Sequence, residues 1–327
     1  MTKSPRSRTR SPPKTPAPSI AIDSVPISGT SKPHPEIGLG LWNLGRWTRQ
    51  DELREESTAS HAIEAGIRWL DTAEVYGAGR SERILGGVLA RHAGISPEQP
   101  FVVSKVSWEH LRPAQVRAAI QGTLERLDRP MVDLYLVHAP DDRVPIADTM
   151  GVLAELADGG RIGAVGVSNF NVPQLDEAQS ALGTRKIAVN QIRYNLIDRE
   201  DGDELRDHCA RTGVILEAYT PLAHGLLTGR FLTPDSIPAA NRRGSRRLDA
   251  EHAEPTLAQV RDLATIAEKA EVTLAAVALH WIRRQGALPL FGASRPEQVD
   301  ANLRAWGTPV PDDVLDAADA VTRSAHD

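Results

Sequence analysis

The chain has 327 residues, of which 41% are hydrophobic and 25% are charged, and its formal net charge is −5. This composition is typical of a globular protein with room for one large domain or two ordinary ones. Its apolar runs are far shorter than the about 20 residues of a membrane helix, and we expect no secretory signal. The single cysteine, Cys209, excludes an intramolecular disulfide and a cysteine-rich zinc site, so we expect a cytoplasmic protein.

The charge is unevenly distributed. The first 20 residues carry five basic side chains, five prolines and no acidic residue, which leaves 33 basic and 43 acidic residues, or −10, for the remainder. A segment with so few apolar groups cannot offset the entropy lost on ordering, so we predict a disordered tail over residues 1–22. One domain then spans residues 23–327. Because this body is acidic, we favour a solvated tail over a nucleic-acid-binding arm.

After a turn-rich hairpin at residues 25–35, short β-branched runs alternate with stretches of helical periodicity. The predicted strands cover residues 37–41, 67–70, 101–104, 132–137, 164–168, 187–190, 214–217 and 288–291. Two helical faces are clear, Val116-Ile120-Leu124-Leu127 and Leu257-Val260-Ala264-Ala267. Gly66 and Gly213 stand between a helical stretch and a strand, where a left-handed helix cap is common.

This alternation predicts an α/β fold of parallel strands joined by helical crossovers. Eight units over roughly 270 residues favour a closed (β/α)₈ TIM barrel in a single domain. An open doubly wound sheet remains the alternative at this point.

The ends of three successive predicted strands carry candidate catalytic residues. Asp71 follows the second strand, Lys105 the third and His138 the fourth, and Tyr76 lies five residues beyond Asp71. In a TIM barrel the carboxyl ends of the strands converge on the active site.

These four residue types together suit the protonation of an alkoxide, as in carbonyl reduction. A nearby ammonium lowers the pKa of a phenol, a carboxylate holds the ammonium in place, and an imidazole binds the same oxygen. Each residue alone has an ordinary explanation: Asp71 as a turn cap, Lys105 as a solvated or Schiff-base lysine, and His138 as a partner of a backbone carbonyl.

Five stretches together resemble the aldo-keto reductases. They are residues 69–77 (WLDTAEVYG), 103–106 (VSKV), 134–138 (LYLVH), 166–170 (GVSNF) and 292–298 (GASRPEQ). The resemblance runs in the expected order from about residue 37 to 302. It implies a TIM barrel that binds a nicotinamide cofactor without a Rossmann fold, and the residues after Gly38 and Gly40 indeed form no G-x-G-x-x-G motif.

The resemblance implies roles for individual residues. Tyr76 would be the general acid, Lys105 and Asp71 would tune it, and His138 would orient the carbonyl. The residues implied at the nicotinamide are Ser168, Asn169, Gln191 and the stacking Tyr219. Those implied along the pyrophosphate are Thr220, Leu222, Gly225 and Leu227. Those implied at the adenosine end are Gly292, Ser294, Arg295, Gln298 and Asn302, with Arg295 at the 2′-phosphate.

We therefore predict reduction of an aldehyde or ketone with NADPH, with NADH still possible. Ser294 stands where many NADPH-preferring members carry a basic residue, and four arginines at 242–247 offer another phosphate contact or a solvated loop. Trp42 and Trp108 would form the substrate pocket wall, together with residues 141–143.

Two other functions remain open. One is a Schiff-base lyase that uses Lys105, and the other is a nucleotide-binding regulatory subunit similar to the β subunits of potassium channels. The specific carbonyl substrate, the physiological direction and the oligomeric state do not follow from the sequence.

Overall fold

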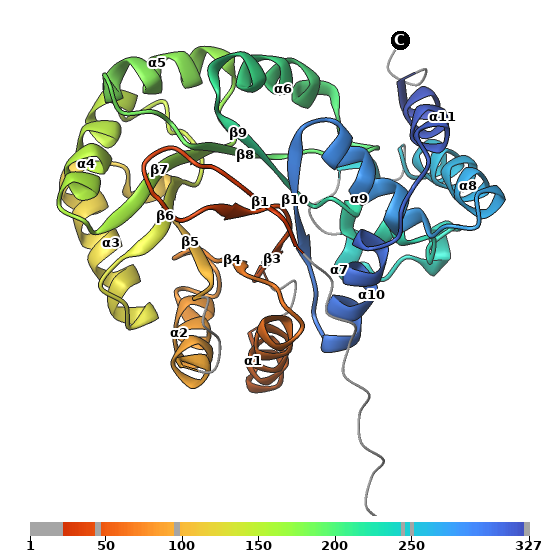
Figure 1. The fold of residues 1–327 in the computed structure, drawn as a ribbon, viewed down its shortest axis with the longest axis horizontal. Helices are drawn as coiled ribbons and strands as arrows, with labels where there is room; N and C mark the ends of the chain where they lie inside the picture. The colour runs from red at the N-terminus through yellow and green to blue at the C-terminus, as the bar shows by residue number, and fades with distance from the viewer. Residues whose placement is uncertain (1–21, 43–46, 95–98, 243–245, 249–251, 324–327) are drawn as a thin grey trace, which may run out of the picture.

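The computed structural model describes residues 22–42, 47–94, 99–242, 246–248 and 252–323. Eight parallel strands close into a barrel in the order β10-β3-β4-β5-β6-β7-β8-β9 (Figure 1), which confirms the predicted (β/α)₈ fold. The strands are β3 Gly38–Gly40, β4 Trp69–Asp71, β5 Phe101–Val106, β6 Val132–Val137, β7 Ile162–Ser168, β8 Val189–Arg193, β9 Ile215–Tyr219 and β10 Ala287–Gly292.

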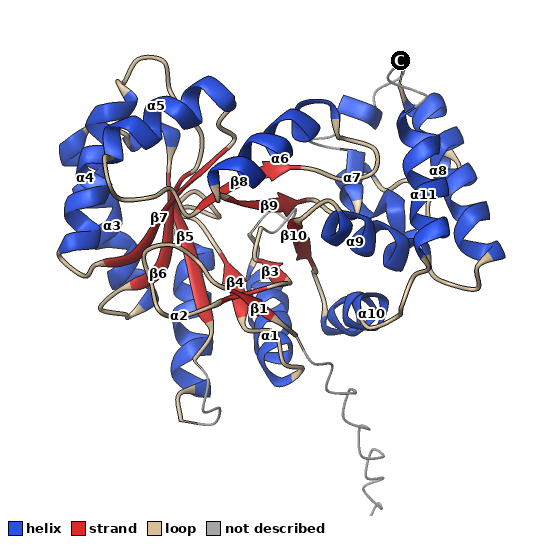
Figure 2. Ribbon diagram, turned by 45° about the horizontal axis from the view of Figure 1, so that its top comes forward, coloured by secondary structure: helices blue, strands red, loops and turns tan. Residues whose placement is uncertain are grey.

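Helices cover the outside of the barrel. They are α1 Arg49–Glu64, α2 Arg80–His92, α3 Pro113–Leu127, α4 Ile146–Asp158, α5 Val172–Leu182, α6 Glu200–Thr212, α7 Ala239–Arg242, α8 Ala253–Lys269, α9 Leu274–Arg284, α10 Pro296–Trp306 and α11 Asp312–Arg323. Helices α1 to α6 follow the strands around the ring, while α8 and α11 pack side by side beyond α9 (Figure 2). The predicted face of α3 is buried throughout, whereas α8 buries Leu263 more completely than the predicted Ala264.

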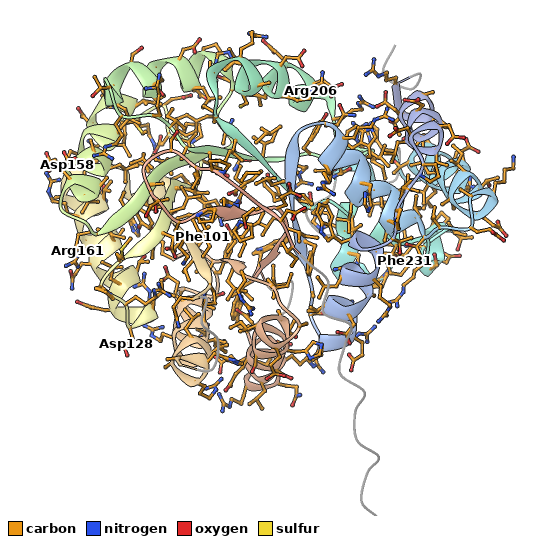
Figure 3. All side chains as sticks on the ribbon, viewed as in Figure 1. Phe101, Asp128, Asp158, Arg161, Arg206 and Phe231 are labelled. Carbon is orange, nitrogen blue, oxygen red and sulfur yellow. The ribbon has the colours of Figure 1, made fainter. Side chains whose placement is uncertain are left out.

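The predicted hairpin is present and closes the amino end of the barrel. Its strands, β1 Ser24–Val25 and β2 His34–Pro35, form an antiparallel pair. The His34 ring packs against the rings of Trp69 and Phe101, at centroid distances of 4.4 and 4.7 Å. Figure 3 shows Phe101 near the centre of the ring, whereas Asp128, Asp158, Arg161 and Arg206 lie on its periphery.

Several strands extend further toward their carboxyl ends than the apolar runs predict. The strand predicted at 187–190 is in fact Val189–Arg193, and the one predicted at 214–217 continues to Tyr219. The reason is that strand pairing uses backbone groups, so the polar side chains of Gln191 and Arg193 do not end the strand. The strands therefore include the polar residues that form the site.

Side chains alternate along each strand between a core outside the barrel and one inside it. Trp69 and Phe101 fill the amino end of the interior, and the polar positions follow two or four residues later on the same strands. The predicted tail lies outside the described residues except for Ile22. Among the described residues no helix is long and apolar enough to cross a membrane.

Candidate active site

The four predicted catalytic residues meet at the carboxyl end of the barrel. The Lys105 Nζ donates to the Asp71 carboxylate, to the Thr72 carbonyl oxygen at 3.0 Å and to the Tyr76 hydroxyl at 3.4 Å. The side chains of Lys105 and Asp71 are 0% and 1% exposed. The His138 ring lies edge-on to the Tyr76 ring, with 5.7 Å between centroids. A buried ion pair thus supports a phenol whose ring faces an imidazole.

A constrained turn places Tyr76. Gly77, Ala78 and Gly79 have φ of 58°, 55° and 80°, a left-handed run that costs free energy for the alanine. A Cβ added to Gly77 would lie 2.4 Å from the Trp47 ring, so this position requires glycine for space as well as for φ. The turn holds the phenol over Lys105.

Glu74 ties this turn to the next loop of the site. Its Oε1 accepts hydrogen bonds from the Ser107 backbone N–H at 2.6 Å and from the His110 Nδ1 at 3.0 Å. The 3₁₀ helix Trp108–His110 is therefore fixed to the loop that carries Tyr76.

Burial dominates the protonation equilibria of the site. Burial raises the pKa of Tyr76 above its usual value, and Lys105 only partly opposes this, so the expected net lowering is wrong. Burial alone would lower the pKa of Lys105, but Asp71 and Tyr76 raise it, so the lysine remains an ammonium. Burial, aided by the charge of Lys105, lowers the pKa of His138 to about 3. The imidazole is therefore neutral near pH 7.

His138 also has a buried nitrogen with no partner among the described residues, Nδ1. The indole of Trp108 lies edge-on to the same imidazole at 5.6 Å. A buried polar atom without a hydrogen bond is costly, and this one belongs to the imidazole that faces the Tyr76 ring.

The residues implied at the nicotinamide form one hydrogen-bonded cluster. Asn169 Nδ2 donates to the His138 carbonyl oxygen at 2.9 Å and to Ser168 Oγ at 3.0 Å, while its Oδ1 accepts from the Tyr219 hydroxyl at 2.9 Å. Ser168 Oγ in turn donates to the carbonyl oxygen of Gln191 at 2.8 Å. Neither Ser168 nor Asn169 caps the helix that follows, because the Asn171 side chain caps α5.

The turn after β9 has a strained backbone. Thr220, Ala223 and His224 have φ of 54°, 46° and 54°, and the buried Thr220 Oγ1 and His224 Nε2 have no partner among the described residues. Positive φ in non-glycine residues is concentrated at ligand sites. Gly225 and Leu227, however, use their backbone N–H groups within the turn, at 2.8 and 3.2 Å from the Leu222 oxygen. Leu227 is also fully buried in the core, so its side chain is structural.

The residues predicted at the adenosine end lie at the end of β10, in the loop that follows it, and on α10. Ser294 bonds Gln298 Oε1 through its backbone N–H at 2.7 Å and its hydroxyl at 3.1 Å. Arg295 is the exposed N-cap of α10, Asn302 is buried on this helix, and Gly292 is exposed. A pocket of about 420 Å³ is lined by Arg230, Arg295, Glu297 and Gln298.

Of the arginines at 242–247, Arg242 and Arg247 are engaged within the protein. The Arg242 Nε donates to the Ile237 carbonyl oxygen at 3.3 Å, and the Arg247 Nε lies 3.2 Å from Asp198 Oδ1. Arg243 lies outside the described residues, as does the Arg246 side chain. Arg242 is exposed and Arg247 is partly buried, so neither the phosphate contact nor the solvated loop is decided by these contacts.

The proposed substrate walls are exposed. Trp42 and Trp108 are 47% and 42% exposed, and the Trp42 ring faces His224 at 6.1 Å. In the loop at 141–143, Arg143 bonds both carboxylate oxygens of Asp141 and lowers its pKa to about 2.

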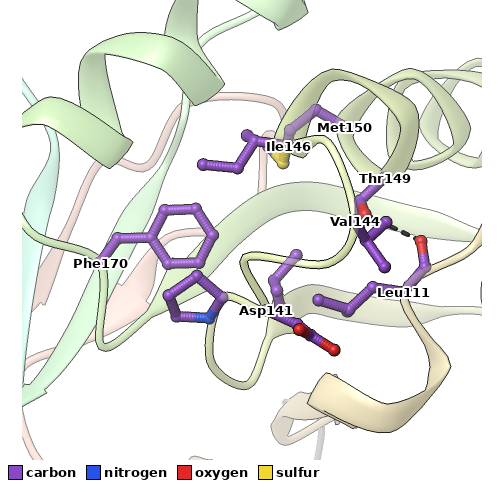
Figure 4. Close-up of a pocket in the computed structure, with 9 residues that line it drawn as sticks. Leu111, Asp141, Val144, Ile146, Thr149, Met150 and Phe170 are labelled. Carbon is purple, nitrogen blue, oxygen red and sulfur yellow. Dashed lines mark hydrogen bonds between the residues drawn. The ribbon is translucent and has the colours of Figure 1, made fainter.

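A small cavity lies behind this loop, between residues such as Leu111, Asp141, Thr149 and Phe170 (Figure 4). The hydroxyl of Thr149 donates to the Leu111 carbonyl oxygen beside it, at 2.8 Å. The cavity has a volume of about 10 Å³, which is room for one water molecule and not for a substrate.

Sequence reasoning missed Glu74, Glu217, His34, His224 and Arg230. Glu217 had a usable signal, because it lies two residues before Tyr219 on one strand and so points to the same side, into the barrel. A glutamate at an inward position is almost never fully buried without a partner, so its position predicts a contact inside the barrel. His34 had no such signal, because its contacts depend on how the hairpin folds over the barrel.

The comparisons with known proteins agree with this geometry. The model of the aldo/keto reductase family matches residues 36–323. An aldo-keto reductase of Bacillus subtilis is 31% identical over 301 residues, covering 87% of this chain and 89% of the relative. An NADH-specific methylglyoxal reductase of Escherichia coli is 29% identical over 311 residues, covering 87% and 93%. The structure of a glycerol dehydrogenase from Gluconobacter oxydans superposes with a TM-score of 0.81 at 29% identity, covering 92% and 95%. The chain therefore belongs to the aldo/keto reductase family and is an NAD(P)H-dependent oxidoreductase.

Proposed function

We propose that the protein reduces an aldehyde or ketone to an alcohol, with NADPH as its preferred cofactor and Tyr76 as the proton donor. The observation that carries this proposal is the Tyr76 hydroxyl, 3.4 Å from a buried ammonium whose other hydrogen bonds go to Asp71 and the Thr72 carbonyl oxygen. A phenol in this setting can lose its proton to a forming alkoxide because a cation stands ready to stabilise the phenolate.

The residues present fit a nicotinamide nucleotide. Buried polar atoms without partners, Thr220 Oγ1 and His224 Nε2, lie in the turn after β9, and a pocket with two arginines lies at the start of α10. Ser168, Asn169, Gln191 and Tyr219 would hold the nicotinamide between these points and the catalytic phenol. When bound, the reduced nicotinamide supplies a hydride to the carbonyl carbon.

The remaining steps belong to the residues of this chain. Tyr76 gives its proton to the carbonyl oxygen, and Lys105 stabilises the phenolate that forms. Asp71 keeps Lys105 charged and in position. His138, neutral because burial lowers its pKa to about 3, orients the substrate oxygen without supplying the proton.

The same geometry disfavours a Schiff-base lyase. A Schiff-base lysine must lose its proton to become a nucleophile, and enzymes achieve this by lowering its pKa. Here Asp71 and Tyr76 raise the pKa of Lys105, and its ammonium has three hydrogen-bond acceptors. Borohydride in the presence of a carbonyl substrate should therefore leave Lys105 unmodified.

The primary test is turnover. Purified protein is mixed with NADPH or NADH and a panel of carbonyls, and oxidation of the reduced nicotinamide is followed by absorbance. Tyr76→Phe should lower kcat on the order of 10²- to 10⁴-fold while leaving NADPH affinity nearly unchanged. Tyr135→Phe, which removes a buried hydroxyl outside the site, is the matched control and should retain activity. Tight NADPH binding without turnover on any carbonyl would instead support a regulatory nucleotide-binding protein.

The preference for NADPH rests on the pocket at α10. Two guanidinium groups, Arg230 and Arg295, face it with one carboxylate, Glu297, so the balance favours a 2′-phosphate. Arg295→Ala should weaken NADPH binding about 10- to 100-fold and NADH binding little. Glu297→Gln should strengthen NADPH binding, because it removes the opposing charge. Equal effects of Arg295→Ala on both nucleotides would remove the phosphate assignment.

For the substrate we propose a small polar carbonyl compound, with Trp42 and Trp108 as walls. The support is that two relatives are named for small polar molecules, methylglyoxal and glycerol. We also propose that residues 23–327 form the catalytic domain and that residues 1–22 are a tail outside it. A cytoplasmic location remains a prediction from composition.

A further inference from the structure

A continuous chain of buried hydrogen bonds runs from the catalytic end of the barrel to its opposite end. The Gln191 Nε2 donates to Asp71 Oδ2 at 2.9 Å and to Glu217 Oε2 at 2.6 Å. Glu217 Oε1 is 2.8 Å from His34 Nε2, and His34 Nδ1 is 2.8 Å from the Pro35 carbonyl oxygen. The side chains of Glu217 and His34 are both 0% exposed.

The hydrogen-bond partners of His34 determine which of its ring nitrogens carry a proton. The Pro35 carbonyl can only accept, so His34 Nδ1 carries a hydrogen. One further proton then lies between His34 Nε2 and Glu217 Oε1, because two acceptors or two donors would repel each other there. The pair is either an imidazolium with a carboxylate or a neutral imidazole with a carboxylic acid, and it is uncharged overall in both forms. Such pairing is what makes two titratable groups tolerable in a dry interior.

The same reasoning fixes the Gln191 amide. The Asp71 carboxylate can only accept, and the Glu217 oxygen accepts as well, so the amide must present its NH₂ group to both. Its carbonyl oxygen is thereby directed away from the interior. Without Glu217, the amide would have one interior partner fewer to hold this orientation.

We propose that Glu217 and His34 are positioning residues that set the charge balance around Asp71 and orient Gln191, and so tune the acidity of Tyr76 from outside the catalytic set. This inference rests on the proposed function, since it concerns the same proton donor. It assigns a purpose to the amino-terminal hairpin, because His34 reaches Glu217 only when β2 closes the barrel.

Arg193 on β8 lies two residues beyond Gln191, and its guanidinium is 5.8 Å from the centroid of the Tyr219 ring, at the catalytic end. Lys105 on β5 and the Tyr76 loop lie on its catalytic side, with His138 and Tyr219 beyond them. The described strands β3, β7 and β10 contain no titratable residue. On β6, Asp133 bonds Lys32 and the Val102 backbone N–H at the amino end. Glu217 is thus the carboxylate nearest to Asp71 along the chain, and after burial and Lys105 it is a cause that raises the pKa of Asp71.

The distances give the direction and scale of the effect. The bonded oxygens of Asp71 and Glu217 share one nitrogen at 2.9 and 2.6 Å, so they are at most about 5.5 Å apart. In its imidazolium–carboxylate form the pair turns its negative end toward Asp71 and its positive end away, so we infer that it disfavours the Tyr76 phenolate and raises the pKa of that phenol. Removing the charge should lower the pKa of Tyr76 by about 0.5 to 1 unit.

Glu217→Gln removes the charge separation within the pair, because it replaces the carboxylate and leaves His34 neutral, yet it can keep every hydrogen bond. The new amide oxygen accepts from Gln191, and the new NH₂ group donates to His34 Nε2, which is free to accept once the imidazole is neutral. We expect the variant to fold and the high-pH limb of its kcat profile to move about 0.5 to 1 unit lower. The loss is greater at high pH because reduction requires protonated Tyr76.

A second measurement does not depend on reductase activity. Tyrosine ionisation of the cofactor-free protein is followed by ultraviolet absorbance, and Tyr76→Phe in each background isolates the Tyr76 contribution. That contribution should titrate at lower pH in Glu217→Gln than in the wild-type chain. If the wild-type chain reduces no carbonyl, the proposed function fails, yet this titration still tests the coupling.

The matched control is Glu82→Gln, another fully buried glutamate, which bonds Ser104 and Arg126 away from the interior chain. It should lower stability without moving either titration. If Glu217→Gln does not fold, His34→Gln serves in its place. It removes the imidazole that shares a proton with Glu217, and so it also changes the charge distribution below Gln191. A Tyr76 titration within 0.2 unit of the wild-type value in the folded variant would overturn the proposal.

Discussion

Replacing Lys105 by methionine separates the proposed catalytic role of the ammonium from its structural role. The Lys105 Nζ is 3.4 Å from the Tyr76 hydroxyl, and at an effective dielectric constant of about 20 a full charge pair at this distance is worth about 5 kcal/mol. A phenolate that is only partly formed in the transition state gains a fraction of this energy. We therefore expect kcat to fall on the order of 10²- to 10⁴-fold, measured with saturating NADPH and a carbonyl substrate.

The same substitution removes the cation beside Asp71. A buried carboxylate without its partner typically costs about 3 to 5 kcal/mol of unfolding free energy, which urea denaturation measures. The double variant Lys105→Met/Asp71→Asn removes the orphaned charge and should recover much of the stability but none of the activity. A single variant with near wild-type kcat, or a double variant that regains activity, would refute the assignment of Lys105 to the phenolate.

Three further outcomes follow from the structure. The folded protein keeps His138 neutral, because burial lowers its pKa to about 3. The contribution of the neutral imidazole to the unfolding free energy is therefore complete above pH 6.5 and is lost as the pH falls toward 3. Between pH 8 and pH 5 the wild-type protein should lose about 1 to 2 kcal/mol more unfolding free energy than His138→Gln. Burial raises the pKa of the Cys209 thiol to about 12, so a maleimide at pH 8 should label it only after denaturation. Glu74→Ala removes the hydrogen bonds to the Ser107 N–H and to His110. It should lower kcat/KM about tenfold without a comparable fall in melting temperature. An unchanged kcat/KM would show that other contacts hold the loop.

Most of the fold could be predicted because hydrophobic period and strand order are local properties of the sequence. The exceptions are informative. The run at 187–190 marks the strand correctly but ends too early, since Gln191 and Arg193 are polar and yet pair with Glu217 and Tyr219 on β9. In a closed barrel the last inward position of each strand faces the site and not the core, so hydropathy falls there while the backbone pairing continues.

The site divides in the same way. Asp71, Tyr76, Lys105 and His138 could be predicted because strand ends converge in any barrel, whatever the details of packing. The sign of the Tyr76 pKa shift could not, because it depends on how far burial exceeds the field of Lys105, which only coordinates reveal. The His34 contact with Glu217 joins residues 183 positions apart, and no local pattern encodes it.

The interior of the barrel contains two buried pairs of titratable side chains, Lys105 with Asp71 and His34 with Glu217, and burying such groups costs free energy. A buried ion pair usually contributes less stability than well-packed apolar side chains of the same volume, so selection for stability alone would favour leucine or valine at these positions. The proposed function accounts for the Lys105 and Asp71 pair, because the ammonium would stabilise the phenolate of Tyr76. Among the described residues, the side-chain hydrogen bonds of His34 and Glu217 go to each other, to the Pro35 carbonyl oxygen and to Gln191, which also bonds Asp71. The proposed effect of this pair on the orientation of Gln191 and on the acidity of Tyr76 offers a physical reason for keeping two titratable groups buried there.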